Sequence, residues 1–285
     1  MERKEHIQDL QPVDFDPFGG SELLRIAPAT EPQLEIWASC LLGGEDANRA
    51  YNESVSLLLT GECKLDALRL ALDDLVNRHE SLRSSFSPDG RKICISRTGT
   101  IWLKYDDLSD KDAATKDQVI EKFSACDAET SFDLINGPLF RTALFKLSDT
   151  KHYLQLTAHH IICDGWSLGI MMQDLGKLYS SRSKGQSLIL PAAPLFSQYA
   201  LSQWKFYESE EFKKVEQYWV DQYKNEVPQL DLPTDYPRPA DRTFKSRRDD
   251  FPMDKELVAA IKKMGARAGS SLVTTFLSAF EVLLY

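Results

Sequence analysis

Two adjacent histidines have the residue type and position best suited to chemistry in this chain. His159 and His160 end a β-rich run, and Asp164-Gly165 follows them just before an amphipathic helical pattern. Imidazole titrates near neutral pH and can accept a proton from an attacking amine or alcohol. A helix that starts after Asp164 would also place free backbone N–H groups beside His160, available to a developing oxyanion. The pattern therefore predicts a base with oxyanion donors nearby.

Strand periodicity predicts different surroundings for the two histidines. Successive side chains of a strand point to opposite faces, so Ala158 and His160 share one face while Thr157 and His159 share the other. We therefore expect only one histidine to face a given cleft. The turn should direct Cys163 away from His160, and the sequence has no Gly-x-Ser-x-Gly elbow. Direct transfer between two bound substrates fits these residues better than a covalent acyl-enzyme.

A structural role is the alternative interpretation of the same residues. Asp-Gly is a common turn, and Asp164 could simply cap the following helix. A histidine pair at the end of an arbitrary strand is also more often structural than catalytic. Residue types and spacing alone leave both interpretations open.

Composition argues against several classes of function. The 285 residues are 42% apolar and 27% charged, as in an ordinary globular protein, and the formal charge of −9 gives no reason to expect nucleic acid or an anionic membrane as partner. The five cysteines are scattered, without a close pair or metal-ligand spacing, so we expect reduced thiols and no metal site. The chain also shows neither a signal peptide nor an apolar run long enough to span a bilayer. These features predict a cytoplasmic protein.

Hydrophobic periodicity predicts the elements that position the histidines. Alternation indicates strands at 53–60, 81–86, 92–96, 101–105, 139–145, 152–158 and 244–251. Thr30, Pro32 and Gln33 fit a helix start with a capping box, and Leu34, Trp37 and Leu41 supply the buried stripe of that helix. Helical spacing indicates further helices at 64–79, 113–128, 168–179, 197–208, 210–224, 254–267 and 271–285. The prolines of segment 232–239 predict an extended connection. Segment 272–285 is strongly apolar and shows no stop signal, so we expect the chain to be truncated there.

Several separated segments resemble the motifs of nonribosomal peptide synthetase condensation domains. Segment 158–167, AHHIICDGWS, closely resembles their H-H-x-x-x-D-G signature, and segment 78–86, RHESLRSSF, resembles R-H-E-x-L-R-T-x-F with Ser84 in the threonine position. Segment 30–37 resembles the opening motif S-x-A-Q-x-R-L-W but departs from it at Thr30, Pro32, Glu35 and Ile36. Segments 132–139, 196–200 and 232–239 also resemble family segments, in the family's order.

The resemblance covers residues from about 26 to 285 and implies an α/β fold (an α+β two-layer sandwich). The expected architecture is a chloramphenicol-acetyltransferase-like lobe with a mixed β-sheet flanked by helices, plus the beginning of a second, similar lobe. The implied divisions are a linker at 1–26, an N-terminal lobe at 27–182, a helical and proline-rich connection at 183–240, and the start of a truncated C-terminal lobe at 241–285. A tunnel between the two lobes would contain the site.

The implied activity is amide-bond formation between two carrier-bound thioesters. An upstream carrier protein would present an acyl or peptidyl group, and a downstream peptidyl carrier would present the aminoacyl group whose amine attacks. No cofactor would bind directly, because phosphopantetheine arms deliver both substrates, and an adenylation domain would be adjacent. Segments 30–37 and 51–54 resemble the subclass that follows polyketide modules, which implies a polyketide-type acyl donor. Because most of the second lobe would be missing, we expect the fragment to be inactive, or nearly so, by itself.

The resemblance also implies roles for individual residues. His160 matches the functional histidine, as a general base or a positioning group, while His159 is expected to be structural. Asp164 matches a structural aspartate, and a partly buried carboxylate needs a cationic partner, for which Arg78 and Arg83 are the candidates.

The resemblance also implies roles for the two residues that follow Asp164. Gly165 would let substrate approach the backbone closely, and Trp166 is expected to pack rather than contact substrate.

The intact histidines argue against a heterocyclisation domain, whereas epimerisation domains share them. A stand-alone acyltransferase that uses coenzyme A or a carrier thioester, and a non-catalytic docking platform, are the alternatives from other classes.

Overall fold

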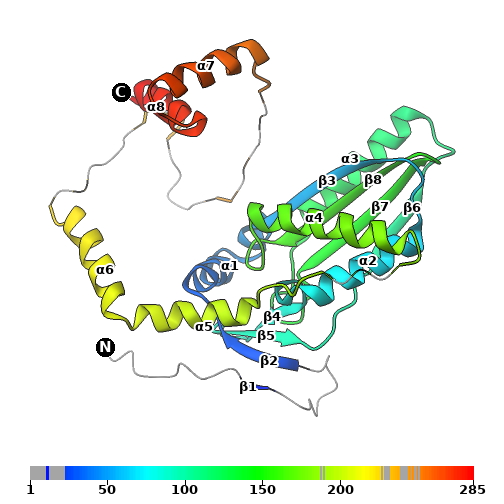
Figure 1. The fold of residues 1–285 in the computed structure, drawn as a ribbon, viewed down its shortest axis with the longest axis horizontal. Helices are drawn as coiled ribbons and strands as arrows, with labels where there is room; N and C mark the ends of the chain where they lie inside the picture. Colours follow the sequence, from blue (N-terminus) through cyan, green and yellow to red (C-terminus); the bar gives the residue numbers. More distant parts are fainter. Residues whose placement is uncertain are drawn as a thin grey trace. The chain divides into compact units, whose positions relative to one another are not determined.

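The computed structural model separates the chain into two units, residues 1–244 and 245–285 (Figure 1). The structure describes residues 11–12, 23–186, 188, 190–225, 227, 232–237, 243–244, 246, 249 and 251–285. Among the described residues, no helix is both long enough and apolar enough to cross a membrane.

A four-stranded mixed sheet forms the centre of the larger unit. Its strands are, in spatial order, β3 (Asn52–Thr60), β8 (Lys151–His159), β7 (Phe140–Ser148) and β6 (Leu103–Asp107). Only the β6–β7 pair is parallel. Three helices flank this sheet: α2 (Leu65–Arg78), α4 (Gly165–Arg182) and α3 (Ala113–Ala128). The predicted mixed sheet flanked by helices is confirmed.

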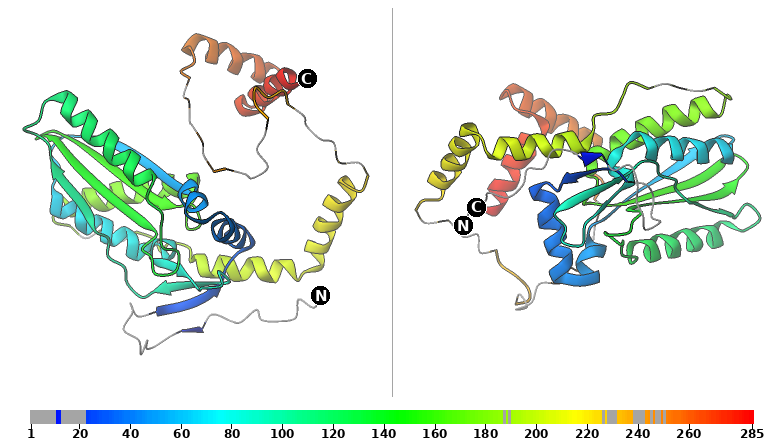
Figure 2. Two further views of the ribbon diagram at one scale, coloured as in Figure 1. Left: turned by 180° about the vertical axis from the view of Figure 1, so that it is seen from behind. Right: turned by 90° about the horizontal axis from the view of Figure 1, so that it is seen from below.

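The helices cover opposite faces of this sheet. Helices α2 and α4 lie side by side on one face, and α3 lies on the other (Figures 1 and 2). Leu154 and Leu156 of β8 belong to the main core with α2 and α4, whereas Tyr153 packs beside Phe123 and Phe145 on the α3 side. Strand β8 is therefore covered on both faces, which holds its end in one position.

A second sheet lies outside this layer and is entirely antiparallel. Its strands are, in spatial order, β1 (Gln11–Pro12), β2 (Leu23–Pro28), β5 (Lys92–Ser96) and β4 (Ser84–Phe86). Strand β2 begins inside the predicted linker. The predicted strand at 81–86 is shorter than expected, because Glu80–Arg83 forms the 3₁₀ helix η1. The Ser84 hydroxyl donates to the Glu80 carbonyl oxygen at 2.6 Å, which stabilises that tight turn.

Helix α1 (Glu31–Ala50) begins as predicted and then bends. Thr30 and Gln33 form the expected capping box, and Pro32 lies in the first turn. Gly44 has a φ of 61°, which interrupts the helix. Leu41, which the helical pattern assigned to the buried stripe, is 74% exposed just before that interruption.

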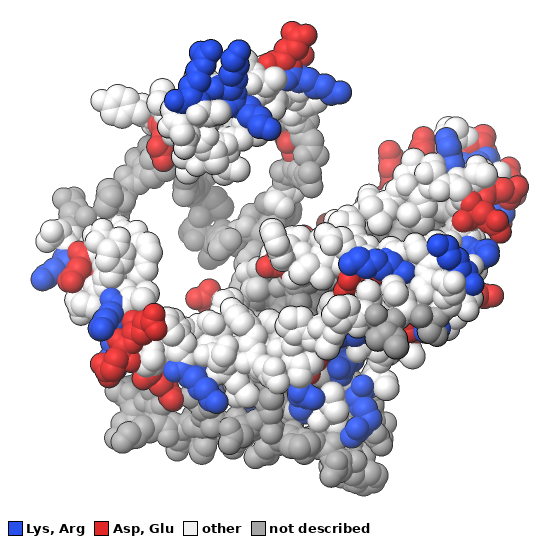
Figure 3. Space-filling model, in the orientation of Figure 1, with Lys and Arg blue, Asp and Glu red and all other residues white. Residues whose placement is uncertain are grey.

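Two helices continue the larger unit after the α4 region. They are α5 (Phe196–Tyr207), which contacts β2, and α6 (Glu210–Gln222). Over the helices of the face drawn in Figure 3, acidic and basic side chains are interspersed. The described residues 232–237 form neither helix nor strand, as their prolines predicted.

The smaller unit is a pair of helices, α7 (Lys255–Arg267) and α8 (Leu272–Leu284). A Cβ at Gly265 would lie 2.1 Å from the Thr275 hydroxyl oxygen, so glycine allows the helices to approach closely. The strand predicted at 244–251 falls largely outside the described residues. The described residues within it form no strand.

Candidate active site

The end of β8 places the two histidines on opposite sides of the backbone. His159 donates its backbone N–H to the Leu139 carbonyl oxygen at 3.0 Å, and His160 donates to the Tyr51 carbonyl oxygen at 2.8 Å. His159 is 0% exposed, whereas the His160 side chain is 39% exposed. The predicted alternation is confirmed, and only His160 is accessible to a substrate.

His159 is enclosed by aromatic rings and a thiol. Its ring lies 5.9 Å from each of the rings of Tyr51 and Phe132, and its Nε2 lies 3.9 Å from the Cys40 sulfur. The Ile161 N–H donates to His159 Nδ1 at 3.2 Å, so the ring proton is assigned to Nε2. Burial lowers the pKa of His159 from 6.5 to about 4. His159 is therefore uncharged near neutral pH.

His160 has a carboxylate beside it that the sequence did not predict. Its Nε2 lies 3.5 Å from Oε1 of Glu53, whose side chain is 35% exposed. Glu53 lies opposite Ala158 in the β3–β8 register, so Glu53, Ala158 and His160 share one face. The sequence shows a carboxylate in a predicted strand, but not that this strand pairs with the histidine strand.

Asp164 caps helix α4 as the Asp-Gly turn suggested. Its Oδ1 accepts the Ser167 N–H at 2.8 Å and the Ser167 hydroxyl at 2.6 Å. These hydrogen bonds, together with the charge of His160, lower the pKa of Asp164. The Ser167 N–H is thereby occupied, which leaves fewer of the oxyanion donors expected at this helix end.

The predicted pairing of Asp164 with Arg78 or Arg83 is wrong. Asp164 is exposed, so its carboxylate is satisfied by the cap and by solvent and needs no cationic partner. Arg78 instead donates from Nε to Asp174 at 2.8 Å and from an η nitrogen to the Pro191 carbonyl oxygen at 2.7 Å. Arg83 donates to the Ser96 carbonyl oxygen. Both arginines fix the scaffold rather than the aspartate.

The first residues of α4 face open space. A Cβ at Gly165 would meet no atom within 4 Å, so packing does not require glycine at this position. Trp166 is 81% exposed, so the prediction that it packs is wrong for the described residues. Space in front of this backbone, next to a half-exposed imidazole, is suited to a substrate chain.

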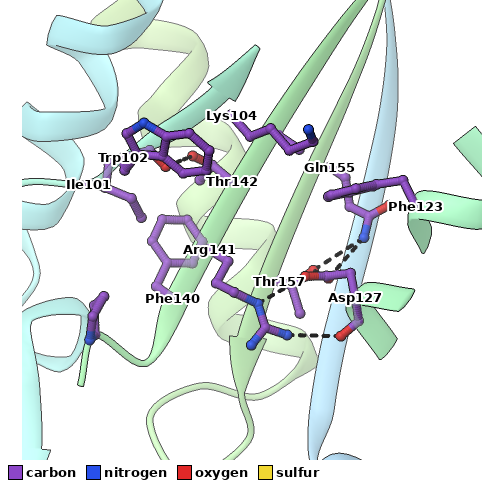
Figure 4. Close-up of a pocket in the computed structure, with 12 residues that line it drawn as sticks. Ile101, Trp102, Lys104, Phe123, Asp127, Phe140, Arg141, Thr142, Gln155 and Thr157 are labelled. Atoms are coloured by element: carbon purple, nitrogen blue, oxygen red, sulfur yellow. Dashed lines mark hydrogen bonds and ion pairs between the residues drawn. The ribbon is translucent and has the colours of Figure 1, made fainter. Parts of the chain in front are cut away.

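A polar network links helix α3 to strands β7 and β8 (Figure 4). The Arg141 Nε donates to Asp127 at 2.9 Å, and Asp127 also accepts from Gln155 and Thr157 at 3.0 and 2.5 Å. The Arg141 guanidinium lies 3.8 Å from the centre of the Phe132 ring, which in turn contacts His159 edge-on. The network thus connects α3 to the ring that packs on the buried histidine.

The residues of this network line a pocket of about 190 Å³ beneath α3. Trp102 and Phe123 contribute apolar lining, and Arg141 and Asp127 lie within it (Figure 4). Thr142 donates its hydroxyl to the Trp102 carbonyl oxygen at 3.2 Å. The side chains of Asp127, Gln155 and Thr157 in this pocket are hydrogen-bonded to one another.

A family model matches the part of the chain that contains all these features. Residues 24–285 match the model described as Condensation domain. The chain belongs to the condensation domain family. Condensation domains of peptide synthetases are acyltransferases that form amide bonds.

The similar proteins of known identity are large synthetases. Surfactin synthase subunit 2 of Bacillus subtilis (strain 168) is 35% identical over 272 residues, which cover 95% of this chain and 7% of that protein. Malpinin synthetase of Mortierella alpina is 34% identical over 262 residues, which cover 90% of this chain and 3% of that protein. The chain therefore spans a small part of the length of the curated relatives it matches.

Solved structures share the fold of the chain. SgcC5 from Streptomyces globisporus superposes with a TM-score of 0.70 at 24% identity, over 90% of this chain and 59% of that chain. A four-domain nonribosomal peptide synthetase bound to AMP and glycine gives 0.73 at 23% identity, over 92% and 20%. The starter condensation domain of rhizomide synthetase gives 0.65 at 23% identity, over 71% and 48%. The fold is that of condensation domains.

Proposed function

We propose that this chain contributes His160 to amide-bond formation between two carrier-bound thioesters. The single observation that carries the proposal is the half-exposed His160 imidazole at the end of β8, next to open space at Gly165. His159 supports it as a buried, uncharged neighbour. Asp164 caps helix α4, so that the helix begins at Gly165. Arg78 and Arg83 stabilise the surrounding fold through their hydrogen bonds.

The reaction joins an acyl donor to an amine acceptor in one transfer. The acceptor nitrogen attacks the thioester carbonyl carbon, and His160 takes a proton from that nitrogen. The carbon–sulfur bond then breaks, and the departing thiolate receives the proton. A covalent acyl-enzyme through Cys163 is not part of the proposal, because burial raises the pKa of its thiol to about 12 and keeps it protonated.

Carrier proteins are the proposed partners on both sides of the reaction. An upstream acyl or peptidyl carrier would deliver the donor, and a downstream peptidyl carrier would deliver the aminoacyl acceptor, each on a phosphopantetheine arm. An adenylation domain would lie next in the same synthetase. The synthetase relatives support this organisation. A polyketide-type donor is a prediction from the resemblance of segments 30–37 and 51–54. A cytoplasmic location is a prediction from the scattered cysteines and from the lack of signal-peptide and membrane-spanning patterns in the sequence.

The division into lobes is part of the same proposal. Residues 27–182 would form the N-terminal lobe, 183–240 the connection, and 241–285 the start of the C-terminal lobe. Strand β2 starts before residue 27, so the linker would end earlier than predicted.

Product formation from two loaded carriers tests the proposal. The donor carrier bears an acyl thioester, the acceptor carrier bears an aminoacyl thioester, and intact-protein mass spectrometry follows both. We expect the acyl mass to move to the acceptor carrier and to form an amide that survives thioester cleavage. The assay is run on the 285-residue chain, which we expect to give little or no product, and on a synthetase subunit that contains it. Turnover of free coenzyme A thioesters at the same rate as carrier-bound thioesters would favour a stand-alone acyltransferase instead.

A further inference from the structure

We propose that Glu53 binds the ammonium group of the acceptor beside His160. This inference rests on the proposed amide-forming function and adds a residue and a substrate class to that site. The acceptor it fits is a cationic primary amine rather than a neutral alcohol. Glu53 would thus contact the substrate directly.

The sheet register fixes Glu53 next to His160. Residues Asn52 to Thr60 of β3 pair without interruption with β8, and Glu53 lies opposite Ala158. The Tyr51 carbonyl oxygen accepts the His160 N–H at 2.8 Å, which extends this pairing by one further bond. Oε1 of Glu53 consequently lies 3.5 Å from Nε2 of His160. Two backbone segments, rather than a mobile loop, hold the pair together.

Glu53 is the carboxylate of this site that remains available to a ligand. Among the described residues, the polar contact of its side chain is the one with His160, and the side chain is 35% exposed. The neighbouring carboxylate, Asp164, is already engaged with the N–H and hydroxyl of Ser167. Both carboxylates act on buried Cys163, where their charges add to burial in raising the thiol pKa. Among the described residues, no lysine or arginine forms an ion pair with Glu53, so its negative charge is available to a cationic substrate group.

In amide formation, the negative charge of Glu53 would bind the ammonium group of the acceptor. An acceptor that arrives as an ammonium must lose two protons from nitrogen before it becomes an amide N–H. Charge-assisted hydrogen bonds from the ammonium to Glu53 would hold its nitrogen beside His160. One proton is lost to water as the amine forms, and the lone pair attacks the carbonyl carbon. His160 takes the second proton and passes it to the departing thiolate, while Glu53 stabilises the transient imidazolium.

A binding experiment on the 285-residue chain tests the contact without requiring turnover. The probe is the glycyl thioester of N-acetylcysteamine, and the control ligand is its N-acetylated form, which has no ammonium. NMR signals of the imidazole groups report binding, and a His160→Gln variant identifies the His160 signal. We expect the His160 signal to move with the amine probe and not with the acetylated one.

Three variants distinguish the effect of losing the Glu53 carboxylate from the effect of losing the fold. Glu53→Gln should weaken binding of the amine probe about tenfold, since it removes a charged hydrogen-bond acceptor, and Glu53→Asp should retain part of the affinity. Glu62→Gln, an exposed glutamate just beyond the other end of β3, should bind like the unaltered chain. Thermal unfolding checks that each variant is folded. Equal affinity of Glu53→Gln and the unaltered chain, or no binding of the amine probe to the unaltered chain, would overturn the proposal.

Turnover in a synthetase subunit that contains the chain distinguishes this inference from the proposed function. Glu53→Gln should lower kcat/KM mainly through a higher KM for amine acceptors, and should leave a hydroxyl acceptor of the same shape unaffected. If the unaltered subunit forms no amide, the proposed function fails while the binding result still decides the role of Glu53. An equal loss with both acceptors would overturn the ammonium contact.

Discussion

The buried histidine makes the stability of the fold sensitive to acid. Burial lowers the pKa of His159 from 6.5 to about 4, so between these values the unfolded chain binds a proton that the folded chain does not. Stability from this group is therefore complete at neutral pH and is lost as the pH falls. Protonation would also place a hydrogen on Nδ1, which now accepts the Ile161 N–H.

We predict that acidification from about pH 7 to pH 5 costs about 2 kcal/mol through His159. Urea unfolding at both pH values measures this loss in the unaltered chain and in a His159→Gln variant, which lacks the titrating ring. The variant should lose about 2 kcal/mol less on acidification. His160→Gln is the control and should retain the full loss. The same pH dependence in all three proteins would contradict the assignment.

Asp164 tests whether a signature residue acts through structure alone. Asp164→Ala removes the N-cap of α4 and should destabilise the fold by about 1 kcal/mol. Asp164→Ser keeps a capping oxygen and should restore both thermal stability and product formation in the synthetase. If Asp164→Ser were stable but as inactive as the alanine variant, the carboxylate charge itself would be required.

Helices α2 and α4 are joined by two ion pairs that differ in burial. Asp174 is buried and accepts from Arg78 at 2.8 Å and His79 at 3.1 Å. Asp74 forms a two-point contact with Arg182 at 2.7 Å, but both of these side chains are about 30% exposed. Removing one partner of a buried pair leaves an uncompensated charge, whereas an exposed pair is screened by water.

We therefore predict unequal effects of two similar substitutions on stability. Asp174→Ala should lower the free energy of unfolding by about 3 kcal/mol, and Asp74→Ala by less than about 1 kcal/mol. Urea unfolding of both variants at neutral pH measures the difference. Equal losses would show that burial does not determine the strength of these contacts.

Local elements could be predicted from the sequence because their signals are local. Side-chain periodicity placed β5 and α3 at their observed residues, and the capping box located the start of α1. The alternation along β8 predicted that only one histidine would face a given cleft, and the family resemblance indicated that this one is His160. The Asp164 partner was predicted wrongly, because the real partners depend on non-local packing. Arg78 pairs with Asp174 where α2 docks against α4, and Arg83 of η1 donates to Ser96 of β5.

The order of the strands in the sheet could not be predicted from local sequence patterns. Glu53 and His160 are far apart in the chain, and only the non-local pairing of β3 with β8 brings them together. The family resemblance predicted the mixed sheet flanked by helices, but it assigned no role to Glu53. Residue-by-residue transfer of a motif cannot identify a functional neighbour outside that motif.

The function proposed for the whole molecule assigns the chemistry of the site to one of two adjacent histidines. His160→Ala and His159→Ala therefore provide the most direct test, in a synthetase subunit that contains this chain and receives both loaded carriers. The measurements are the rate of amide formation per folded molecule and the thermal unfolding midpoint. We predict that His160→Ala loses at least about a hundredfold in rate, as for a general base, with a nearly unchanged midpoint, while His159→Ala mainly lowers the midpoint. An undiminished rate in His160→Ala would contradict the account.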